Sequence, residues 1–511
     1  MRQTWLIVAL AAAVALLILP LWLAGTPAMP DYPARLAGFY LIGGGAASAP
    51  LSGFYGIRWA AIPNLAGEIA VPFLARFMAL DVAARLFLSV GVAMWVAAPA
   101  LIQRALYGRV GVTALAASFF AWNVNFMWGF FNYYFAAGLC LVMFAGWIAS
   151  DAWPRAVRLL VFALATVVLY FCHILAAGLF LLLAACFQVA RRASWRGVVV
   201  DVAVLAAPVA VLYLLKPGEV GGGVEFNLLG TLLPRIASLV QCSFASPAYV
   251  LIAVLALLFV ASVWRGWISV HRDMRLVLIA LALAALLVPE IIMGGWGLHL
   301  RFPAVAAALL LASSDATMPR RAAGVVGAAI LAVMGWMSFA LAHEWQGYDT
   351  QIGDFRAALR EVPRGSHLMT VVDAEDKGEI PNRLYWHVAE FAIIDRDAFT
   401  ALMFATKGQH VVTLKPALAG FAAKSARDGT PPEMNDLNEL AAGDAHDPKI
   451  REELHYLLRF QCHYDEVVLI HANGRPAKVP SMLRLRREGS FFALYDVVRP
   501  AGCSTMAAMR P

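Results

Sequence analysis

Asp31 lies in a short segment whose backbone is restrained by two prolines. Residues 30–35 read Pro-Asp-Tyr-Pro-Ala-Arg, and they follow a long apolar stretch. Because proline fixes φ, the carboxylate is held near the end of that stretch. Partial loss of water there suits it to act as a general base toward a hydroxyl group. Two structural roles stay open: capping a helix that starts near Pro33, or pairing with Arg35 one turn on.

Four further polar residues follow in or between apolar runs. Glu68 lies in the same polar segment as Asp31, and spacing does not decide whether it shares a site or is solvated. Asn132 and Tyr133 have side chains that bind sugar hydroxyls, and His173 has one that binds phosphate or shuttles a proton. The alternatives are an interfacial aromatic belt and hydrogen bonds between helices.

A second group of polar residues surrounds Arg301. Glu290 and His299 precede it in a glycine-rich stretch, and glycine allows close approach of a ligand to the backbone. The guanidinium offers a two-pronged donor to phosphate; an ion pair with Glu290 is the competing interpretation. Lys216, beside Pro217, is a second phosphate-binding candidate, although a side chain that reaches from a helix end to the membrane surface explains it equally well.

The chain around these residues is strongly apolar. Of its 511 residues, 61% are hydrophobic and 14% charged, whereas ordinary globular proteins have about 25% charged residues. Residues 1–343 hold 20 Lys and Arg against 10 Asp and Glu, and residues 344–511 hold 20 against 23. The sequence therefore predicts an α-helical polytopic membrane domain over 1–343 and a water-soluble domain over 344–511. The net charge of +7 comes from arginines of the membrane part and does not indicate nucleic-acid binding.

Apolar runs predict about eleven transmembrane helices. They lie at 5–24, 83–102, 110–128, 134–150, 157–172, 175–190, 198–215, 247–264, 276–292, 302–313 and 322–342. Arginines occupy every second connection, as the positive-inside rule requires. This register predicts a cytoplasmic N-terminus. It places a large outer loop at 26–81, made of short surface helices, on the same outer side as all the candidate residues above and the C-terminal domain.

The sequence of residues 344–511 predicts a small soluble α/β domain. Helical patterns cover 352–361 and 383–395, and strand patterns cover 367–372, 411–414, 466–470 and 491–495. The polar stretch 424–448 is predicted to be a mobile loop. Cys462 and Cys503 can pair if this domain lies in an oxidising compartment. The four other cysteines, Cys140, Cys172, Cys186 and Cys242, are interpreted as packing residues.

Motifs of several functional classes do not occur in the sequence. It contains no Walker motif, Rossmann fingerprint, HExxH motif, or GxSxG motif in a strand–turn–helix context. It also lacks the chains of buried acidic residues that relay ions in secondary transporters. These observations argue against ATP-driven pumps, nucleotide-using enzymes, zinc proteases and standard serine hydrolases.

The order of these features resembles the GT-C superfamily of integral-membrane glycosyltransferases. The shared features are a first helix, a long outer loop with an early acidic residue, short inner turns and an outer C-terminal α/β domain. More narrowly, the chain is similar to a group of bacterial multi-pass proteins near that superfamily in residues 30–37, 128–133, 170–173 and 385–387.

This resemblance implies an inverting sugar transfer in a bacterial inner membrane. The donor would be a polyprenyl-phosphate-linked sugar, and the acceptor a saccharide, lipid or protein at the periplasmic face. Asp31 would deprotonate the acceptor hydroxyl, and Arg301, with Lys216 or His173, would bind the donor phosphate. Arg35, Glu68, Asn132, Tyr133, Glu290 and His299 would contact substrate. Many members carry paired acidic residues in the first loop, whereas Tyr32 follows Asp31 here, so a divalent metal is an open expectation.

Two other functional classes are compatible with the same residues. A carrier or flippase for a lipid-linked or polar substrate would use the outer polar cluster as a binding vestibule, although it would need neither the large loop nor the C-terminal domain. A non-catalytic subunit for assembly of envelope polysaccharide would use that domain to bind partners.

Overall fold

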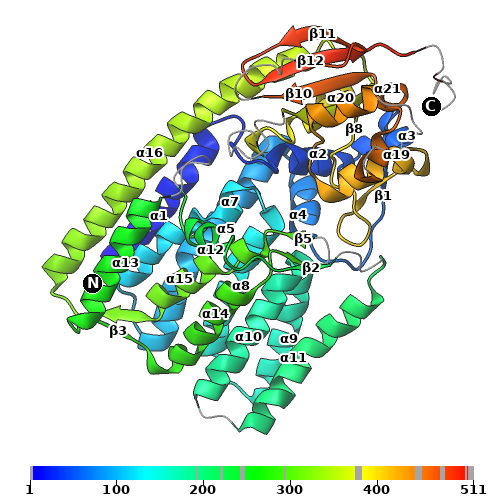
Figure 1. Ribbon diagram of the computed structural model, residues 1–511. Coiled ribbons are helices and arrows are strands. Elements are labelled where there is room, and N and C mark those ends of the chain that lie inside the picture. Colours follow the sequence, from blue (N-terminus) through cyan, green and yellow to red (C-terminus); the bar gives the residue numbers. More distant parts are fainter. Residues whose placement is uncertain are drawn as a thin grey trace. The chain divides into compact units, whose positions relative to one another are not determined.

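The computed structural model, drawn in Figure 1, divides into two compact units. It describes residues 4–191, 194–218, 223–241, 248–292, 295–373, 383–442, 452–471, 478–500 and 503. Unit 1 comprises Met1–Gly25, Ala61–Ile69 and Ala84–Glu344, and unit 2 comprises Thr26–Ala60, Ala70–Ala83 and Trp345–Pro511. The change in composition near residue 343 thus coincides with a boundary between the units, and most of the predicted outer loop belongs with the C-terminal residues.

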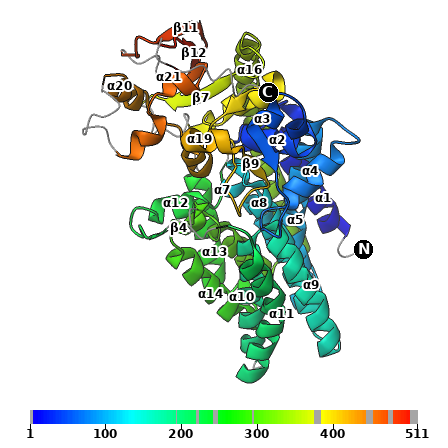
Figure 2. The same ribbon diagram turned by 90° about the vertical axis from the view of Figure 1, so that its right-hand side faces the viewer.

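Apolar helices make up most of unit 1. Six helices of the described chain are long and apolar enough to cross a membrane: α1 (Thr4–Leu23), α5 (Leu80–Tyr107), α8 (Phe131–Ala149), α9 (Arg155–Cys172), α11 (Trp195–Leu215) and α16 (Arg320–Leu359). α10 (Ile174–Ala190) lies beside α9 and α11 in both views (Figures 1 and 2). Helices that are apolar on every side need an apolar environment, which agrees with the predicted membrane class.

The other predicted spans form shorter helices. These are α10, α13 (Tyr249–Trp264), α14 (Arg275–Leu287) and α15 (Pro303–Ala312). The run 110–128 is broken into α6 (Val112–Ala116), the 3-10 helix η2 (Ala117–Ala121) and α7 (Val124–Met127). The break has a local cause, because the Asn123 side chain accepts the Asn125 N–H and so starts a new helix. Six spans are supported by length and composition, and the total of about eleven stays a prediction.

Two small sheets connect helices within unit 1. β2 (Val224–Glu225), β4 (Ile291–Ile292) and β5 (Gly295–Trp296) form a three-stranded antiparallel sheet, followed by the 3-10 helix η4 (Leu298–Leu300). β3 (Ile268–Val270), which precedes η3 (Arg272–Met274), pairs with β6 (Ser314–Ala316). The short helix α12 (Leu232–Ala237) packs against α14. These elements position the segment that carries Arg301.

Unit 2 contains a five-stranded mixed sheet. Its order is β11 (Leu483–Glu488), β12 (Phe492–Val497), β10 (Glu466–Ile470), β7 (His367–Val372) and β8 (Phe399–Thr400). β7 is parallel to β10 and β8, whereas β12 is antiparallel to β10 and β11. The predicted strands at 367–372, 466–470 and 491–495 are confirmed. Sequence patterning misses β11 because it reads Leu-Arg-Leu-Arg-Arg-Glu and has only one buried side chain, that of Leu483.

The helices of unit 2 correct several sequence predictions. The stretch 424–448 is not a loop in its described part, because α19 (Pro416–Asp428) extends into it and α20 (Met434–Ala442) follows. The apolar residues of these two helices recur three or four positions apart. The sequence prediction missed this spacing because the segment is polar overall. The predicted helix 352–361 is the end of α16, and 383–395 contains η5 (Val388–Glu390) and α18 (Phe391–Arg396). The remaining helices are α2 (Tyr32–Ile42), η1 (Gly45–Ala47), α3 (Leu51–Phe54), α4 (Ala66–Leu74), η6 (Glu452–Leu457) and α21 (Phe460–His463).

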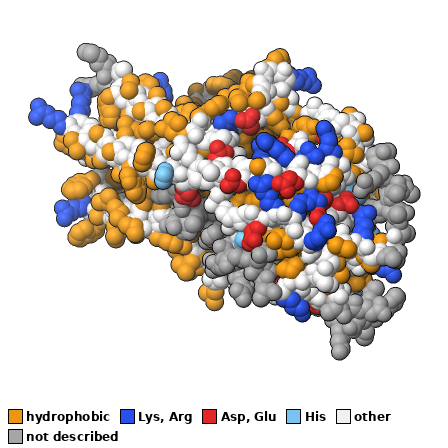
Figure 3. Space-filling view, turned by 90° about the horizontal axis from the view of Figure 1, so that it is seen from above, with side chains coloured by type: hydrophobic (Ala, Val, Ile, Leu, Met, Phe, Trp, Pro, Cys, Tyr) orange, Lys and Arg blue, Asp and Glu red, His pale blue; other side chains and the backbone are white. Residues whose placement is uncertain are grey.

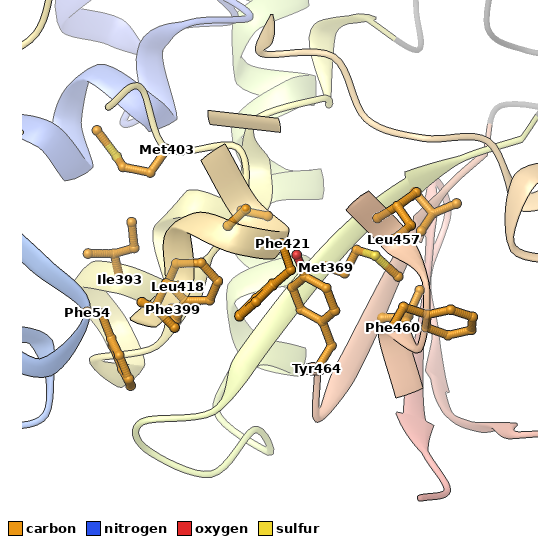
Figure 4. Packing of buried hydrophobic residues seen from close by; sticks show 14 of the residues in the cluster. Phe54, Met369, Ile393, Phe399, Met403, Leu418, Phe421, Leu457, Phe460 and Tyr464 are labelled. Atoms are coloured by element: carbon orange, nitrogen blue, oxygen red, sulfur yellow. The ribbon is translucent and has the colours of Figure 1, made fainter. Parts of the chain in front are cut away.

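One hydrophobic core joins residues from both ends of the sequence of unit 2. Figure 4 shows Phe54 close to Phe399 and Ile393, with Phe421 and Tyr464 further along the same core. β1 (Tyr55–Ile57) also pairs with β9 (Val412–Leu414), in agreement with the strand predicted at 411–414. Residues 26–60 are therefore an integral part of the C-terminal fold.

The covalent and surface features of unit 2 are those of a protein domain in water. Cys462 and Cys503 form a disulfide, as the sequence allows for an oxidising compartment. Ion pairs lie along the sheet and its border, including Arg484 with Asp496 and Arg487 with Glu361. Figure 3 shows basic and acidic side chains interspersed over one part of the surface, and hydrophobic side chains predominating over another.

Candidate functional site

The Arg301 side chain lies in an aromatic setting in unit 1. Arg301 follows η4, where Gly297 adopts a left-handed φ of 76°, and directly precedes α15. Its guanidinium carbon lies 4.7 Å from the ring centroid of Phe130 and 4.8 Å from that of Tyr133. These contacts are cation–π interactions, which strengthen where water is excluded. The rings hold the guanidinium in place.

His173 places a second nitrogen donor beside Arg301. α9 ends and α10 begins at this residue, and its Nδ1 accepts the Leu175 N–H at 3.2 Å. A neutral imidazole whose Nδ1 accepts carries its proton on Nε2. That Nε2 lies 3.3 Å from Arg301 Nη1, which is itself a donor. In this tautomer an anionic oxygen can accept from both nitrogens, and the N-terminus of α10 adds favourable potential for an anion.

Tyr133 links these two residues to α8. Its hydroxyl donates to the Arg301 backbone carbonyl, and its ring meets the His173 ring edge-on with centroids 5.1 Å apart. Trp296 contributes a carbonyl 3.5 Å from Arg301 Nη2. The structure thus brings together three of the residues predicted from sequence, Tyr133, His173 and Arg301, although they come from widely separated parts of the chain.

Glu290 and His299 lie on the other side of Trp296. The Trp296 indole N–H donates to Glu290 Oε1 at 3.2 Å, and the Trp296 ring contacts Trp128 with centroids 4.9 Å apart. His299 is buried, and among the described residues its Nδ1 has no hydrogen-bond partner. Trp128 and Trp296 were not singled out from sequence as site residues, because tryptophan is common in any membrane protein.

Glu68 and Asn132 are in contact, and the hydrogen bonds of Asn132 hold neighbouring segments of the backbone in place. Asn132 donates to Glu68 Oε2 at 2.7 Å and to the Asn64 carbonyl at 2.9 Å, and it accepts the Gly67 N–H at 2.7 Å. One amide therefore fastens residues 64–68 to the first turn of α8. This use of all its polar atoms makes Asn132 a positioning residue for Tyr133, the next residue along.

Lys216 has a different environment. It caps the C-terminal end of α11, where its ammonium lies 5.3 Å from the ring centroid of Tyr213. The described residues show no contact between Lys216 and either His173 or Arg301. The structure supports the interpretation of Lys216 as a helix-end residue that contacts an aromatic ring.

Asp31 and Arg35 belong to unit 2. Asp31 occupies the N-cap position of α2, yet its side chain makes no capping hydrogen bond. Its carboxylate is 4.0 Å from the Arg35 guanidinium, at the outer limit of an ion pair, and the residue is only 7% exposed. The pairing predicted as an alternative role is present, whereas the capping role is not.

Arg35 is surrounded by groups that sequence reasoning did not assign to a site. Its guanidinium lies 4.9 Å from the Phe404 ring centroid, and that ring contacts His387 and His410 at centroid distances of 4.8 and 5.6 Å. Burial, and then the charge of Arg35, lower the pKa of each histidine to about 3. Both imidazoles are therefore neutral at physiological pH.

A fully buried carboxyl group adjoins His387. Glu390 Oε2 lies 3.7 Å from His387 Nδ1, and burial raises the pKa of Glu390 far above its ordinary value. Burial thus favours the protonated form of this carboxyl group. In the sequence, Glu390 is visible only as a single glutamate in an apolar stretch of a predicted helix. Because such a glutamate is common on helix surfaces, it does not indicate a buried acid.

Across both units, the described side chains include no group of three or more His, Cys, Asp or Glu residues suited to hold a metal ion. The contacts described above suit anion binding by Arg301 and His173, and the carboxyl groups suit proton transfer. Comparisons with protein-family models, curated proteins and solved structures find no match to this chain.

Proposed function

We propose that this chain is an integral-membrane glycosyltransferase that transfers a sugar from a polyprenyl-phosphate donor to an acceptor on the extracytoplasmic side. The observation that carries the proposal is the pair of nitrogen donors, Arg301 Nη1 and His173 Nε2, 3.3 Å apart within an aromatic setting. A phosphodiester oxygen satisfies both donors at once. An ionisable residue within an apolar unit is a functional signal because its desolvation is costly.

The reaction follows from the chemistry of the donor. Asp31 accepts the proton of the acceptor hydroxyl, and the oxygen attacks the anomeric carbon with inversion. The bond from that carbon to the phosphate oxygen breaks, and the lipid phosphate leaves with the electron pair. Arg301 and His173 stabilise the negative charge that develops on the phosphate. Arg35, 4.0 Å from Asp31, orients the carboxylate.

Two features support an extracytoplasmic location for unit 2 in this proposal. The Cys462–Cys503 disulfide requires an oxidising compartment to persist. The alternation of arginine-rich connections supports the same location, on the outer side of a bacterial inner membrane whose cytoplasmic side holds the N-terminus. A reporter enzyme that is active only in the periplasm, fused after Pro511, should be active; an inactive fusion that is stably expressed would refute this orientation.

The function is tested by transfer in proteoliposomes. The full-length chain should release free polyprenyl phosphate from a polyprenyl-phosphate sugar and form a glycosidic bond of inverted configuration, identified by mass spectrometry and NMR. Movement of the intact donor across the bilayer without cleavage would identify a carrier instead. Binding of polyprenyl phosphate without either activity would favour an assembly subunit.

A further inference from the structure

Residues 228–238, which include α12, expose apolar side chains and bury polar ones, the reverse of a water-exposed loop. Their exposed side chains include Leu229, Leu232, Leu233 and Ile236, with exposed fractions of 88%, 45%, 66% and 40%. These positions follow the i, i+3, i+4, i+7 spacing of one helical face. The polar residues Thr231, Arg235 and Ser238 are buried instead, at no more than 5% exposure.

The buried polar side chains are satisfied inside the protein. The Arg235 guanidinium donates to the carbonyls of Ala285 at 2.5 Å and Val288 at 2.8 Å, at the C-terminal end of α14. A cation at a helix C-terminus is favourable because it meets the unpaired carbonyls there. Thr231 donates to the Asn227 carbonyl, and Ser238 donates to the Arg235 carbonyl.

The backbone of the segment is also paired internally. Thr231 N–H bonds to the Asn227 carbonyl, Arg235 N–H to that of Thr231, and Ser238 N–H to that of Pro234. β2 pairs with β4, and the Glu290 N–H donates to the Glu225 carbonyl. Internal pairing of backbone groups is the condition that hydrocarbon imposes on non-helical chain, because no water is available there.

The apolar face of the segment adjoins that of α14. Arg235 fixes α12 to the end of that helix, against which α12 packs (Figures 1 and 2). α14 exposes Ile279, Leu283 and Leu287 to more than half of their full area. In water, such a surface would lose the favourable free energy that burial of each large apolar side chain provides.

We infer that residues 228–238 form a re-entrant element that lies in the hydrocarbon layer of the membrane, with Leu229 and Leu233 against lipid acyl chains, and that the exposed polar residues Glu225 and Asn227 lie outside this layer. The occupant of this surface is the bilayer, because the apolar face adjoins that of α14 and because the polar side chains of residues 228–238 are turned inward. The inference depends on membrane insertion of unit 1 and does not depend on sugar transfer.

Nitroxide spin labels test the inference in the full-length chain. The four cysteines outside the disulfide are replaced by alanine, and single cysteines are introduced by Leu229→Cys and Leu233→Cys. Leu257→Cys on the exposed face of α13 is the lipid control. Ser481→Cys, at an exposed position of unit 2, is the water control. The chain is reconstituted in vesicles of equimolar phosphatidylcholine and phosphatidylglycerol.

The ratio of oxygen collisions to collisions with a polar nickel chelate distinguishes lipid from water. We expect this ratio at 229 and 233 to equal that at 257 within about twofold and to exceed that at 481 roughly tenfold, since hydrocarbon excludes polar solutes. A water-like ratio at 229 and 233 beside a lipid-like ratio at 257 would refute the re-entrant element alone. A water-like ratio at 257 would also refute membrane insertion, and protection of 229 and 233 from both reagents would show that protein covers the segment.

Discussion

The two units of this chain differ in the kind of side chain that they expose. In unit 1, α13 has no buried residue and exposes Leu257 and Val260, whereas Arg235 and His299 are buried. In unit 2, every residue of β10 is buried, and charged side chains pair at the surface. The difference follows from the two solvents: water favours an apolar interior, whereas lipid allows apolar surfaces and requires that polar groups be paired internally.

This contrast determines how each polar residue should be interpreted. An arginine in unit 1 that lies between two aromatic rings and beside an imidazole has a high desolvation cost, so a bound anion is a reasonable explanation. The neutral histidines and Glu390 of unit 2 are compatible with an ordinary hydrogen-bonded or packed interior. Of the proposed roles, phosphate binding by Arg301 and His173 of unit 1 is therefore the one that this contrast supports.

The largest expected effect is that of Asp31→Asn on catalysis. The substitution keeps the shape of the side chain but removes its basicity, and general-base catalysis contributes about 10²- to 10⁴-fold. We expect the transfer rate to fall by about 1000-fold at saturating donor, with donor binding unchanged. Rates in proteoliposomes and binding of polyprenyl phosphate by native mass spectrometry measure the two quantities.

Asp436→Asn is the matched control for Asp31→Asn. Asp436 is also a carboxylate of unit 2 with 7% exposure, and it accepts the Glu433 N–H before α20, a role that asparagine also fills. This variant should transfer sugar at the normal rate. Full activity of Asp31→Asn, or equal loss in both variants, would contradict a catalytic role for Asp31.

A smaller effect is expected from Arg301→Ala, and it should fall on binding. Loss of a charge-assisted contact to the donor phosphate should weaken binding of polyprenyl phosphate about 100-fold. Arg301→Lys keeps the charge but loses the planar fork, so its affinity should be intermediate. Arg58→Ala, at an exposed position of unit 2, should bind normally. Equal affinities of the Arg301 and Arg58 variants would favour a structural role for Arg301.

Much of the fold is predictable because apolar periodicity reports the local environment. Runs such as 134–150 and 466–470 correspond to α8 and β10 with small shifts at their ends. The pairing of β1 with β9 was not predictable, because it joins residues more than 350 positions apart and depends on tertiary packing. β11 was missed for a related reason: four of its six residues are charged, and of its two alternating leucines only Leu483 is buried, as is common in an edge strand.

The sequence indicated which residues to consider for the candidate site, but it did not indicate which of them lie close together. A charged or polar residue at the end of an apolar run is visible in sequence, which is how His173 and Arg301 were found. The position of Lys216 beside Tyr213 and the use of Asn132 to hold Glu68 depend on side-chain geometry. His387, His410 and Phe404 approach Arg35 only through the tertiary fold of unit 2.

Tyr55→Phe tests whether residues 26–60 are a structural part of unit 2. The Tyr55 hydroxyl accepts the Thr400 N–H at 2.9 Å and donates to the Thr400 carbonyl at 3.1 Å, in a fully buried setting. Its loss should lower the free energy of local opening by about 1–3 kcal/mol. Hydrogen exchange of β7 and β8 measures this quantity.

Tyr464→Phe is the control for Tyr55→Phe. Tyr464 is equally buried in the same core, and among the described residues its hydroxyl has no hydrogen-bond partner. Removing that hydroxyl should leave protection unchanged or raise it. Equal protection in both variants would mean that the contact of residues 26–60 with β8 contributes nothing to the stability of unit 2.

The last expected effect concerns the pH dependence of unit 2. Burial, and then the neighbouring Asp465, raise the pKa of Glu466 to about 7, although Arg486 opposes the shift. Between about pH 4.5 and 7 the folded chain holds a proton that the unfolded chain releases. This contribution to stability is therefore full below pH 4.5 and is lost as the pH rises through 7. Glu466→Gln should remove a slope of up to about 1.4 kcal/mol per pH unit in this window.

Melting temperatures of the detergent-solubilised chain across this pH range measure the Glu466 contribution as a difference from the unsubstituted protein. The difference is the informative quantity, because His387 and His410 act with the opposite sign: their lowered pKa values give stability that is lost as the pH falls from 6.5 toward 3. Glu488→Gln, which replaces an exposed carboxylate on β11, should leave the pH profile unchanged. Parallel profiles for Glu466→Gln and the unsubstituted chain would show that Glu466 is ionised in the fold and that its pairing with Arg486 outweighs its burial.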